Sequence, residues 1–366
     1  MIYNIILTHD CNKNCTYCLN QESEVPFPRQ VAYSLDDLKR FTAMDDHPVL
    51  AFYGGEPLLA MDLMERMMDE VPAEKYIIQT NGHFLNRLED EYLFQFDCML
   101  VSIDGRKEIT DFYRGEGTHD RVIGNVENLR KRGFKAEITA RMCASQRTDI
   151  HEDVSYLLGL RDGRDAPLFS GVHWQNDMQF GAREDWDDLD GWLRESYYPG
   201  IEFLVEDWIS DMELQGDVRL VYPFTGIMGT LLTGTPAKLR CGCGHFNHNI
   251  CTDGRITACP VSSDFYPRFL IGDIRSTHPR ELVNALECGE PCTSCTIRDI
   301  CGGRCLYANL LKPWGEAGFS NTCETVQHLV NTLKRQQPRV RSLLETGRIS
   351  MAQFEYFKYN GAEIIP

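Results

Sequence analysis

Three cysteines near the start of the sequence have the residue types and the spacing for iron–sulfur chemistry. Cys11, Cys15 and Cys18 form a CxxxCxxC pattern directly after the apolar run IYNIILT. A cubane iron–sulfur cluster takes four thiolate ligands, so three thiolates on one loop leave one iron free to bind another molecule. Zinc is the alternative, but zinc sites favour paired CxxC motifs. The spacing therefore favours a cluster with one open iron.

Ten of the fifteen cysteines lie together between positions 241 and 323. A CxC motif precedes a hairpin-like stretch in which Asp253-Gly254 supplies the turn. A single cysteine, a CxxCxxxxxCxxxC motif and a last cysteine follow. The candidate ligands are Cys241, Cys243, Cys259, Cys292, Cys295, Cys301, Cys305 and Cys323. Eight thiolates would complete two cubane clusters, and a zinc ribbon with four cysteine ligands is the alternative.

The first half of the chain supplies the elements that must position these residues, because it alternates strand-like and helix-like segments. This pattern predicts a parallel α/β sheet or barrel. Strands are expected at residues 2–8, 48–53, 75–80, 96–103, 136–142 and 168–175. The unusual residues stand at or just after the ends of these strands: the cysteine loop, Gly54, Gly55, Glu56, Asn81, Ser102, Asp104, Arg141 and Gln175. In a βα barrel the active site lies at this edge, where the carboxyl ends of the strands meet.

The composition limits the remaining possibilities. The 366 residues are 43% hydrophobic and 25% charged, which suffices for a large core and two domains, expected at residues 1–235 and 236–366. A net charge of −17 argues against a nucleic-acid partner. The sequence has no apolar run of membrane-spanning length and no signal-peptide pattern. We therefore expect a cytoplasmic protein, without a membrane partner, whose cysteines bind metal rather than form disulfides.

The CxxxCxxC loop and the segment YGGEP (53–57) resemble the radical S-adenosylmethionine (radical SAM) superfamily. This resemblance implies a partial (β/α)6 TIM-type barrel in which SAM binds the open iron. The resemblance further implies the roles of single residues in binding SAM. Gly54, Gly55 and Glu56 would contact the methionine moiety, and Ser102 and Arg141 would face its carboxylate. Asn81 and Asp104 would lie near the ribose and Tyr17 beside the adenine, with Gln175 at the same edge of the barrel. Turn chemistry is the alternative for Asn81 and Asp104. For Arg141 an anionic partner is expected even without the resemblance, because burying an unpaired guanidinium costs free energy.

The cysteine pattern after residue 236 resembles the SPASM domain, a small cysteine-rich domain with a β-hairpin and helices. The resemblance implies two auxiliary [4Fe–4S] clusters, and three clusters in all. One would be held by Cys241, Cys243, Cys259 and Cys305, and the other by Cys292, Cys295, Cys301 and Cys323. The segment CGGRCLYANLL (301–311) is most similar to the archaeal radical SAM/SPASM proteins assigned to peptide modification.

Radical SAM/SPASM proteins are anaerobic oxidoreductases of peptides and proteins, so the resemblance implies a peptide or protein substrate and an external electron donor such as ferredoxin or flavodoxin. The complete ligand set favours an oxidative product, a cross-link or a dehydrogenated residue. Sulfatase-maturing relatives carry an Asp where this chain has Pro260, which disfavours formylglycine formation although Asp264 lies nearby. The alternatives are a peptide epimerase, a radical enzyme acting on a small molecule, and a non-catalytic iron–sulfur or zinc protein.

Four cysteines remain outside the predicted ligand sets. Cys98 and Cys251 lie in strand-like runs and are expected to be small buried hydrophobes. Cys288 is an alternate ligand candidate because it stands close to Cys292. Cys143 follows Arg141 by two residues, so both side chains are expected on one face of a strand. Its thiol is a candidate hydrogen-atom donor, and a packed thiol is the alternative. A helix is also expected over residues 181–215, with Trp192, Phe203 and Trp208 in the core.

Overall fold

A computed structural model describes the chain except for residues 19–25, 178–185, 262–266, 359–360 and 362. Its described residues form one ten-stranded sheet. The strands are β1 (Ile2–Thr8), β2 (Val49–Gly54), β3 (Lys75–Thr80), β4 (Phe96–Ser102), β5 (Glu137–Ala144), β6 (Gly171–Asn176), β7 (Leu220–Val221), β8 (Asn247–Ile250), β9 (Arg255–Thr257) and β10 (Leu270–Asp273).

Helices follow most of these strands. They are α1 (Leu35–Thr42), α2 (Met61–Glu70), α3 (Asp90–Leu93), α4 (Lys107–Arg114), α5 (Thr118–Arg132), α6 (Ile150–Gly159), α7 (Leu189–Trp192), α8 (Tyr198–Gln215), α9 (Tyr222–Thr233), α10 (Arg298–Cys301), α11 (Leu306–Leu311) and α12 (Gly315–Glu345). Shorter 3₁₀ or π segments are η2 (Pro57–Ala60), η3 (Leu85–Arg87), η6 (Leu193–Tyr197), η8 (Pro279–Leu282), η9 (Cys292–Ser294) and η10 (Met351–Phe354).

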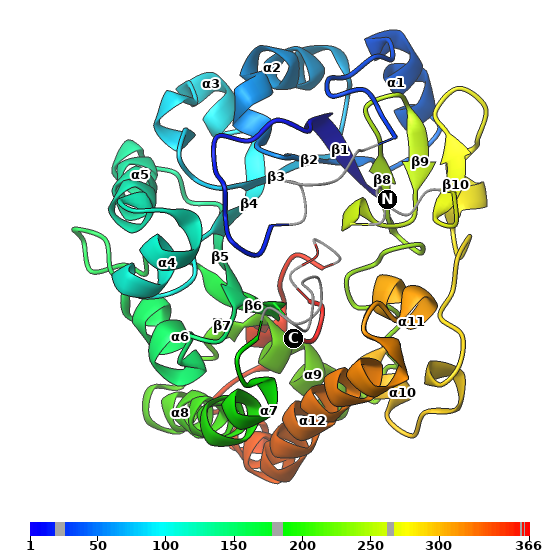
Figure 1. Cartoon of the computed structure of the whole chain (residues 1–366). Coiled ribbons are helices and arrows are strands. Elements are labelled where there is room, and N and C mark those ends of the chain that lie inside the picture. Colours follow the sequence, from blue (N-terminus) through cyan, green and yellow to red (C-terminus); the bar gives the residue numbers. More distant parts are fainter. Residues whose placement is uncertain (19–25, 178–185, 262–266, 359–360, 362) are drawn as a thin grey trace.

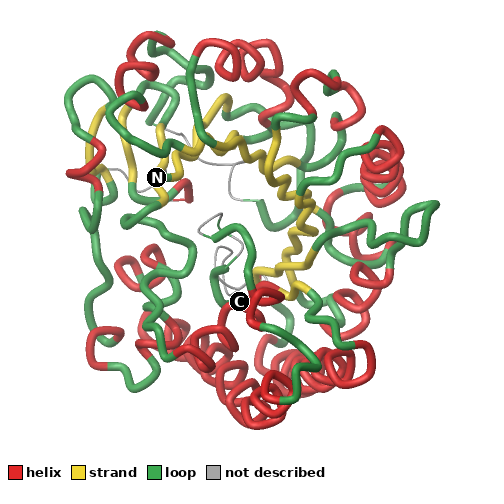
Figure 2. Tube along the Cα trace, turned by 180° about the vertical axis from the view of Figure 1, so that it is seen from behind, coloured by secondary structure: helices red, strands yellow, loops and turns green. Residues whose placement is uncertain are grey.

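The sheet is a partial barrel, as the sequence predicts. Strands β1 to β7 are parallel and lie side by side in chain order. They form an arc with the helices around its outside (Figures 1 and 2). All six predicted strands are present, but β6 begins at Gly171 instead of residue 168. Ser170 stands directly before β6, and its hydroxyl accepts the backbone N–H of Ile138 at 3.0 Å.

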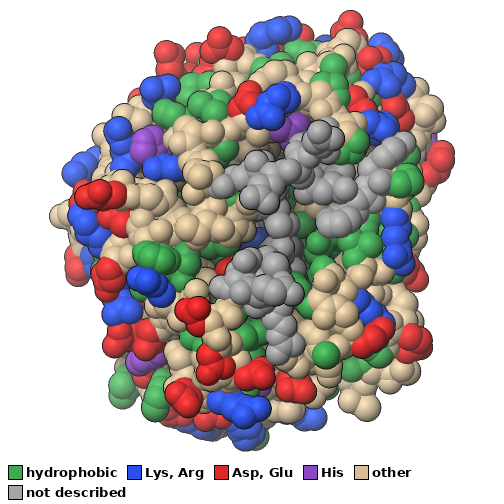
Figure 3. Space-filling view, viewed as in Figure 1, with side chains coloured by type: hydrophobic (Ala, Val, Ile, Leu, Met, Phe, Trp, Pro, Cys, Tyr) green, Lys and Arg blue, Asp and Glu red, His purple; other side chains and the backbone are tan. Residues whose placement is uncertain are grey.

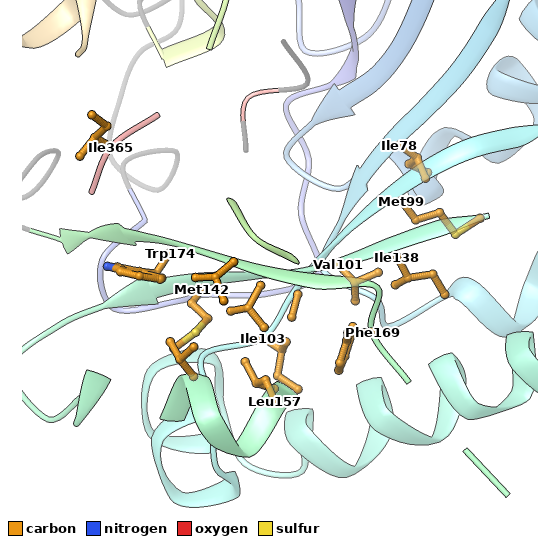
Figure 4. Close-up of a cluster of buried hydrophobic side chains, with 14 of the residues drawn as sticks. Ile78, Met99, Val101, Ile103, Ile138, Met142, Leu157, Phe169, Trp174 and Ile365 are labelled. Carbon is orange, nitrogen blue, oxygen red and sulfur yellow. The ribbon is translucent and has the colours of Figure 1, made fainter. Parts of the chain in front are cut away.

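Side chains alternate between the two faces of each strand. One face packs against the helices: Met99 and Val101 of β4, Ile138 of β5 and Leu157 of α6 belong to a single buried cluster (Figure 4). The other face points into the barrel. Near its floor this inner face is apolar, and its buried cluster comprises Ile2, Val49, Ala51, Ile77, Cys98, Leu100 and Tyr222. Polar side chains on the inner face are therefore found further along the strands.

The predicted helix over residues 181–215 is described from Asp188 onwards as α7, η6 and α8. Trp192 and Trp208 are buried, as predicted. The prediction for Phe203 is wrong, because its side chain is 61% exposed. Its ring lies on the outer surface of α8, 5.7 Å from the ring of His151. The helical spacing of the aromatic residues did not show which of them lie on the buried side of the helix.

The cysteine-rich part of the chain continues the barrel sheet. Strand β8 pairs in parallel with β1, β9 pairs antiparallel with β8, and β10 pairs antiparallel with β9. The predicted turn at Asp253-Gly254 joins β8 to β9, and Gly254 has a φ of +92° that suits glycine. Helix α12 packs against α8 and α9 and so closes the open side of the arc.

Acidic and basic side chains are interspersed over the face that carries the strand ends (Figure 3). Within the described ranges, the helices are either too short or too polar to cross a membrane.

Candidate radical SAM site

Six inward-facing side chains near the carboxyl ends of β2 to β6 line one cavity of about 290 Å³, called here the barrel cavity. They are Tyr53, Gln79, Ser102, Arg141, Cys143 and Gln175. The period-two alternation of strands places them on this face, and parallel strands bring their ends to one edge. The cavity is also lined by the predicted residues Cys11, Cys15, Tyr17, Cys18, Gly54, Gly55 and Asn81. The structure thus brings most of the predicted site residues together.

The cysteine loop is attached to the barrel through Asp104, which is fully buried. Its carboxylate accepts hydrogen bonds from the hydroxyl of Tyr17 in the loop and from two guanidinium nitrogens of Arg114 on α4, both at 2.8 Å. It also accepts the backbone N–H of Cys143 at 2.9 Å. Burial raises the pKa of Tyr17 well above its ordinary value. Asp104 does not line the cavity, so it positions the loop rather than facing the predicted place of a ribose.

The glycine segment holds the start of the same loop through its backbone. The N–H of Gly55 donates to the carbonyl of Thr8, and the N–H of Glu56 donates to the carbonyl of Asp10, both at 2.8 Å. The approach leaves no room for side chains. A Cβ on Gly54 would lie 2.3 Å from the oxygen of Thr8, and one on Gly55 would lie 2.3 Å from the oxygen of Asp10. This close packing explains why two glycines stand here.

The Glu56 carboxylate points away from the cavity that its neighbours line. It is fully buried and accepts hydrogen bonds from the hydroxyl of Thr80 at 2.7 Å and the backbone N–H groups of Asn81 at 2.7 Å and Leu58 at 3.1 Å. Burial raises its pKa from 4.5 to about 7, although these hydrogen bonds oppose the shift. In this structure the carboxylate ties β2 to β3, and the contact of Glu56 with the SAM methionine moiety stays a prediction.

Arg141 lies on the inner face of β5, and its hydrogen-bond partners are neutral. Its Nη1 lies 2.9 Å from Nδ1 of His173 and donates to the carbonyl of Gly361 at 2.7 Å. His173 Nε2 contacts the carbonyl of Ile364 at 2.9 Å, so residues close to the C-terminus support both side chains. Burial lowers the pKa of Arg141. Among the described residues no ion pair neutralises Arg141, and its contact with an anion stays a prediction.

Cys143 places its thiol at the cavity wall, as predicted from its position two residues after Arg141. Burial raises its pKa well above the ordinary value, and the charges of Asp177 and Asp104 act in the same direction. The thiol therefore keeps its hydrogen at neutral pH. Asp177 also lines the cavity, and it accepts a hydrogen bond from Ser145 at 2.8 Å.

Four of the cysteines predicted to bind one auxiliary cluster line a second cavity, called here the proximal cysteine cavity. They are Cys241, Cys243, Cys259 and Cys305. Cys243 hydrogen-bonds with both Cys241 and Cys259. This cavity adjoins the barrel cavity, because both are lined by Tyr53, Gln79, Arg141, Gln175, Pro260 and Val261. The two spaces therefore share part of their lining.

The other four predicted ligands line a third cavity, called here the distal cysteine cavity. They are Cys292, Cys295, Cys301 and Cys323, and Cys305 also contacts it. Arg304 lines the same cavity, although its side chain is only 6% exposed. Its three guanidinium nitrogens have no hydrogen-bond partner within the described part of the chain. Across the described ranges, no three His, Cys, Asp or Glu side chains meet closely enough to hold a single metal ion.

The remaining cysteines follow the expectations only in part. Cys98 and Cys251 are buried, as predicted. The thiol of Cys288 donates to the carbonyl of Gly303 at 3.5 Å and does not line either cysteine cavity. Asp264 lies outside the described residues.

Sequence reasoning missed Tyr53, Gln79 and Arg304 as site residues. Tyr53 and Gln79 occupy the inward positions just before the ends of β2 and β3, so the strand alternation contained a usable signal. For Gln79 the signal was stronger, because it is a polar residue in the apolar run YIIQ. The burial of Arg304 depends on tertiary packing and had no signal of this kind.

Comparisons with known proteins agree with this geometry. A family model described as the radical SAM superfamily matches residues 5–149. Fe-coproporphyrin III synthase of Methanosarcina barkeri is 29% identical over 138 residues, covering 35% of this chain and only 34% of that protein. Mycofactocin maturase MftC of Mycolicibacterium smegmatis is 26% identical over 332 residues, covering 82% of this chain and 77% of that protein.

The fold was also compared with solved structures. That of native anSMEcpe with bound AdoMet and Cp18Cys peptide matches with a TM-score of 0.69 at 19% identity, covering 93% of this chain and 99% of that chain. The family model covers the cysteine loop, the glycine segment and strands β1 to β5, and the fold agrees over nearly the whole length. Residues 5–149 of the chain are therefore similar to the radical SAM superfamily.

Proposed function

We propose that the protein is a radical SAM enzyme that modifies a peptide or protein by hydrogen abstraction. When bound, SAM and the [4Fe–4S] cluster implied by the family supply a 5′-deoxyadenosyl radical that abstracts hydrogen. Cys11, Cys15 and Cys18 would hold the cluster. The observation that carries the proposal is that all three line one cavity together with Arg141 and the other predicted SAM contacts.

The residues of the barrel cavity suit the charges of SAM. Arg141 has no anionic partner among the described residues, and its guanidinium would bind the SAM carboxylate. The backbone of Gly54 and Gly55 lies open to the cavity and would accommodate the methionine moiety. Tyr17, Asn81, Ser102 and Gln175 also line the space and remain candidates for further SAM contacts.

We propose further that residues 236–366 act as a SPASM domain with two auxiliary [4Fe–4S] clusters. The donor sets fit, because each of the two cysteine cavities contains the four thiols of one predicted ligand set. The proximal cysteine cavity adjoins the barrel cavity, and this favours an oxidative product that is lighter than the substrate by two hydrogens. The reducing electron would come from an external donor such as ferredoxin or flavodoxin.

A peptide or protein substrate is supported by the similar proteins. The solved structure of anSMEcpe contains a Cp18Cys peptide, and MftC is a maturase by name. Pro260 stands in the wall shared by the barrel cavity and the proximal cysteine cavity. It provides no side-chain base there, which disfavours formylglycine formation as the reaction of this chain.

Epimerisation is a second candidate function, and one observation favours it. The protonated thiol of Cys143 lines the barrel cavity, where it could return a hydrogen atom to a substrate radical. A peptide epimerase needs such a donor, whereas an oxidative enzyme does not.

Iron analysis and product analysis test the proposal. Anaerobically reconstituted protein should hold about twelve irons with matching sulfide, and replacing Cys11, Cys15 and Cys18 by Ala should remove about a third of the iron and all 5′-deoxyadenosine formation. Mass spectrometry of small proteins encoded beside this chain, with and without its expression, should identify the modified substrate. Stoichiometric zinc without sulfide would refute the proposal.

A further inference from the structure

Arg304 is a buried cation whose charge has no counterpart in the described structure. Its side chain is 6% exposed, and Nε, Nη1 and Nη2 have no hydrogen-bond partner there. Arginine keeps its charge in proteins. Removing one partner from a buried ion pair strongly destabilises a protein, because the remaining charge is uncompensated. A guanidinium buried in this way therefore indicates an anionic occupant of the space that it faces.

The backbone around Arg304 fixes the side chain in this place. Gly302, Gly303 and Arg304 all have positive φ, with a value of 48° for Arg304. A residue with a side chain rarely adopts this conformation, because its Cβ comes too close to the following carbonyl oxygen. The turn is packed from both sides, since a Cβ on Gly302 would lie 2.9 Å from the backbone nitrogen of Leu239 and one on Gly303 would lie 3.2 Å from the thiol of Cys288. The fold thus maintains a strained conformation that directs a cation inwards.

The groups around the guanidinium identify the anion. The charge interactions that act most strongly on the guanidinium are those with the thiols of Cys305, Cys301 and Cys323 and with the hydroxyl of Tyr197. Cys301 and Cys323 belong to the distal cysteine cavity, which Arg304 lines. A cubane cluster with four thiolate ligands carries a net negative charge, and reduction adds one more electron to it. A neighbouring cation stabilises the reduced form more than the oxidised form.

We propose that Arg304 is a positioning residue that raises the reduction potential of the cluster held by Cys292, Cys295, Cys301 and Cys323. This inference rests on the proposed function, because it requires a cluster in the distal cysteine cavity. Arg304 contributes electrostatically and through its fixed orientation, and it is not a ligand. Hydrogen bonds and charge near the cluster sulfurs are among the factors that set such potentials.

Redox titration of the holoenzyme tests this inference. The potential is measured by electron paramagnetic resonance on the signal that Cys323→Ser removes. Arg304→Gln should lower the potential by an amount equivalent to at least a tenfold change in the reduction equilibrium, about 59 mV for one electron. Arg304→Lys keeps the charge and should retain most of the wild-type potential.

Arg298 offers a matched control at the edge of the same cavity. It is exposed, and its guanidinium donates to the carbonyl of Thr293 at 3.2 Å. Because solvent and salt screen an exposed charge, Arg298→Gln should shift the potential far less than Arg304→Gln.

An Arg304→Gln potential equal to that of the wild type, with full iron content, would overturn the inference while leaving the proposed function intact. If Arg304→Gln does not hold the distal cluster, the potential of Arg304→Lys is compared with that of the wild type instead. Arg304→Lys should hold the cluster at nearly the wild-type potential. Loss of the cluster in both variants would overturn the electrostatic role. Zinc in place of iron in the wild-type protein would instead overturn the proposed function, and this inference with it.

Discussion

The close approach between Gly55 and the cysteine loop predicts a selective defect in the variant Gly55→Ala. The new Cβ would lie 2.3 Å from the oxygen and 2.7 Å from the carbonyl carbon of Asp10, whereas ordinary contact begins at 3.4 Å. Both obstructing atoms belong to the backbone, so no side-chain rotation can relieve the overlap. The loop segment that leads into Cys11 must move by about 1 Å.

The magnitude follows from the contacts that this movement disturbs. Overpacking in a buried region costs about 1 to 3 kcal/mol. The two backbone hydrogen bonds to Thr8 and Asp10, each 2.8 Å long, contribute about 0.5 to 1.5 kcal/mol apiece. The sum is about 2 to 6 kcal/mol, which overlaps only the lower end of the stability of a typical folded domain, about 5 to 15 kcal/mol. We therefore expect Gly55→Ala to fold, with a displaced cysteine loop.

Iron content and thermal unfolding measure this defect. Reconstituted Gly55→Ala should lose about a third of its iron and most 5′-deoxyadenosine formation, while the spectra of the auxiliary clusters persist. Gly124→Ala is the matched control, since Gly124 is exposed in α5 and its Cβ would meet nothing within 4 Å. That variant should gain about 1 kcal/mol of helix stability and keep all its iron. Full iron and full SAM cleavage in Gly55→Ala would refute the argument from close packing.

Three further predictions concern the barrel cavity. Arg141→Ala should weaken SAM binding at least tenfold with the clusters intact, because a charge-assisted hydrogen bond contributes about 1.5 to 3 kcal/mol; unchanged affinity by calorimetry would contradict the assigned contact. The Glu56 carboxyl ionises near pH 4.5 when unfolded but near pH 7 when folded, so its contribution to stability is lost as the pH rises through 7. The free energy of unfolding of Glu56→Gln, measured in urea relative to that of the wild type, should therefore rise by about 2 kcal/mol between pH 5 and pH 8. A difference that stays constant over this range would argue against the buried carboxylate. If the reaction is oxidative, Cys143→Ala should still yield a product lighter by two hydrogens; 5′-deoxyadenosine without product in this variant, together with one carbon-bound deuterium from heavy water in the wild-type product, would establish epimerisation instead.

The parallel barrel could be predicted from the sequence because its signals are local. Strand runs such as IYNIILT and KYIIQT reappear as β1 and β3 with the expected bounds. The meeting of Cys11 with Arg141 in one cavity also follows from local information, since parallel strands necessarily align their carboxyl ends. The N-cap of α1 is local too, with the side chain of Ser34 accepting the N–H of Asp37.

The remainder depends on contacts between distant residues. The sequence shows an acidic side chain after a strand at both Glu56 and Asp104, but it does not show which groups will surround the carboxylates. In the structure Glu56 ties two strands together and Asp104 holds the cysteine loop. The support of Arg141 by the carbonyl of Gly361 joins residues 220 positions apart. Such pairings are properties of the packed molecule and cannot be deduced from spacing.

The wall common to the barrel cavity and the proximal cysteine cavity has a consequence for engineering this protein. Tyr53, Gln79 and Gln175 each present surface to both spaces. A substitution that enlarges the barrel cavity would therefore also change the solvation and polarity of the proximal cysteine cavity. If the proposed substrate and cluster occupy these two cavities, substrate scope and cluster potential cannot be changed independently, and variants made for either should be checked spectroscopically for the other.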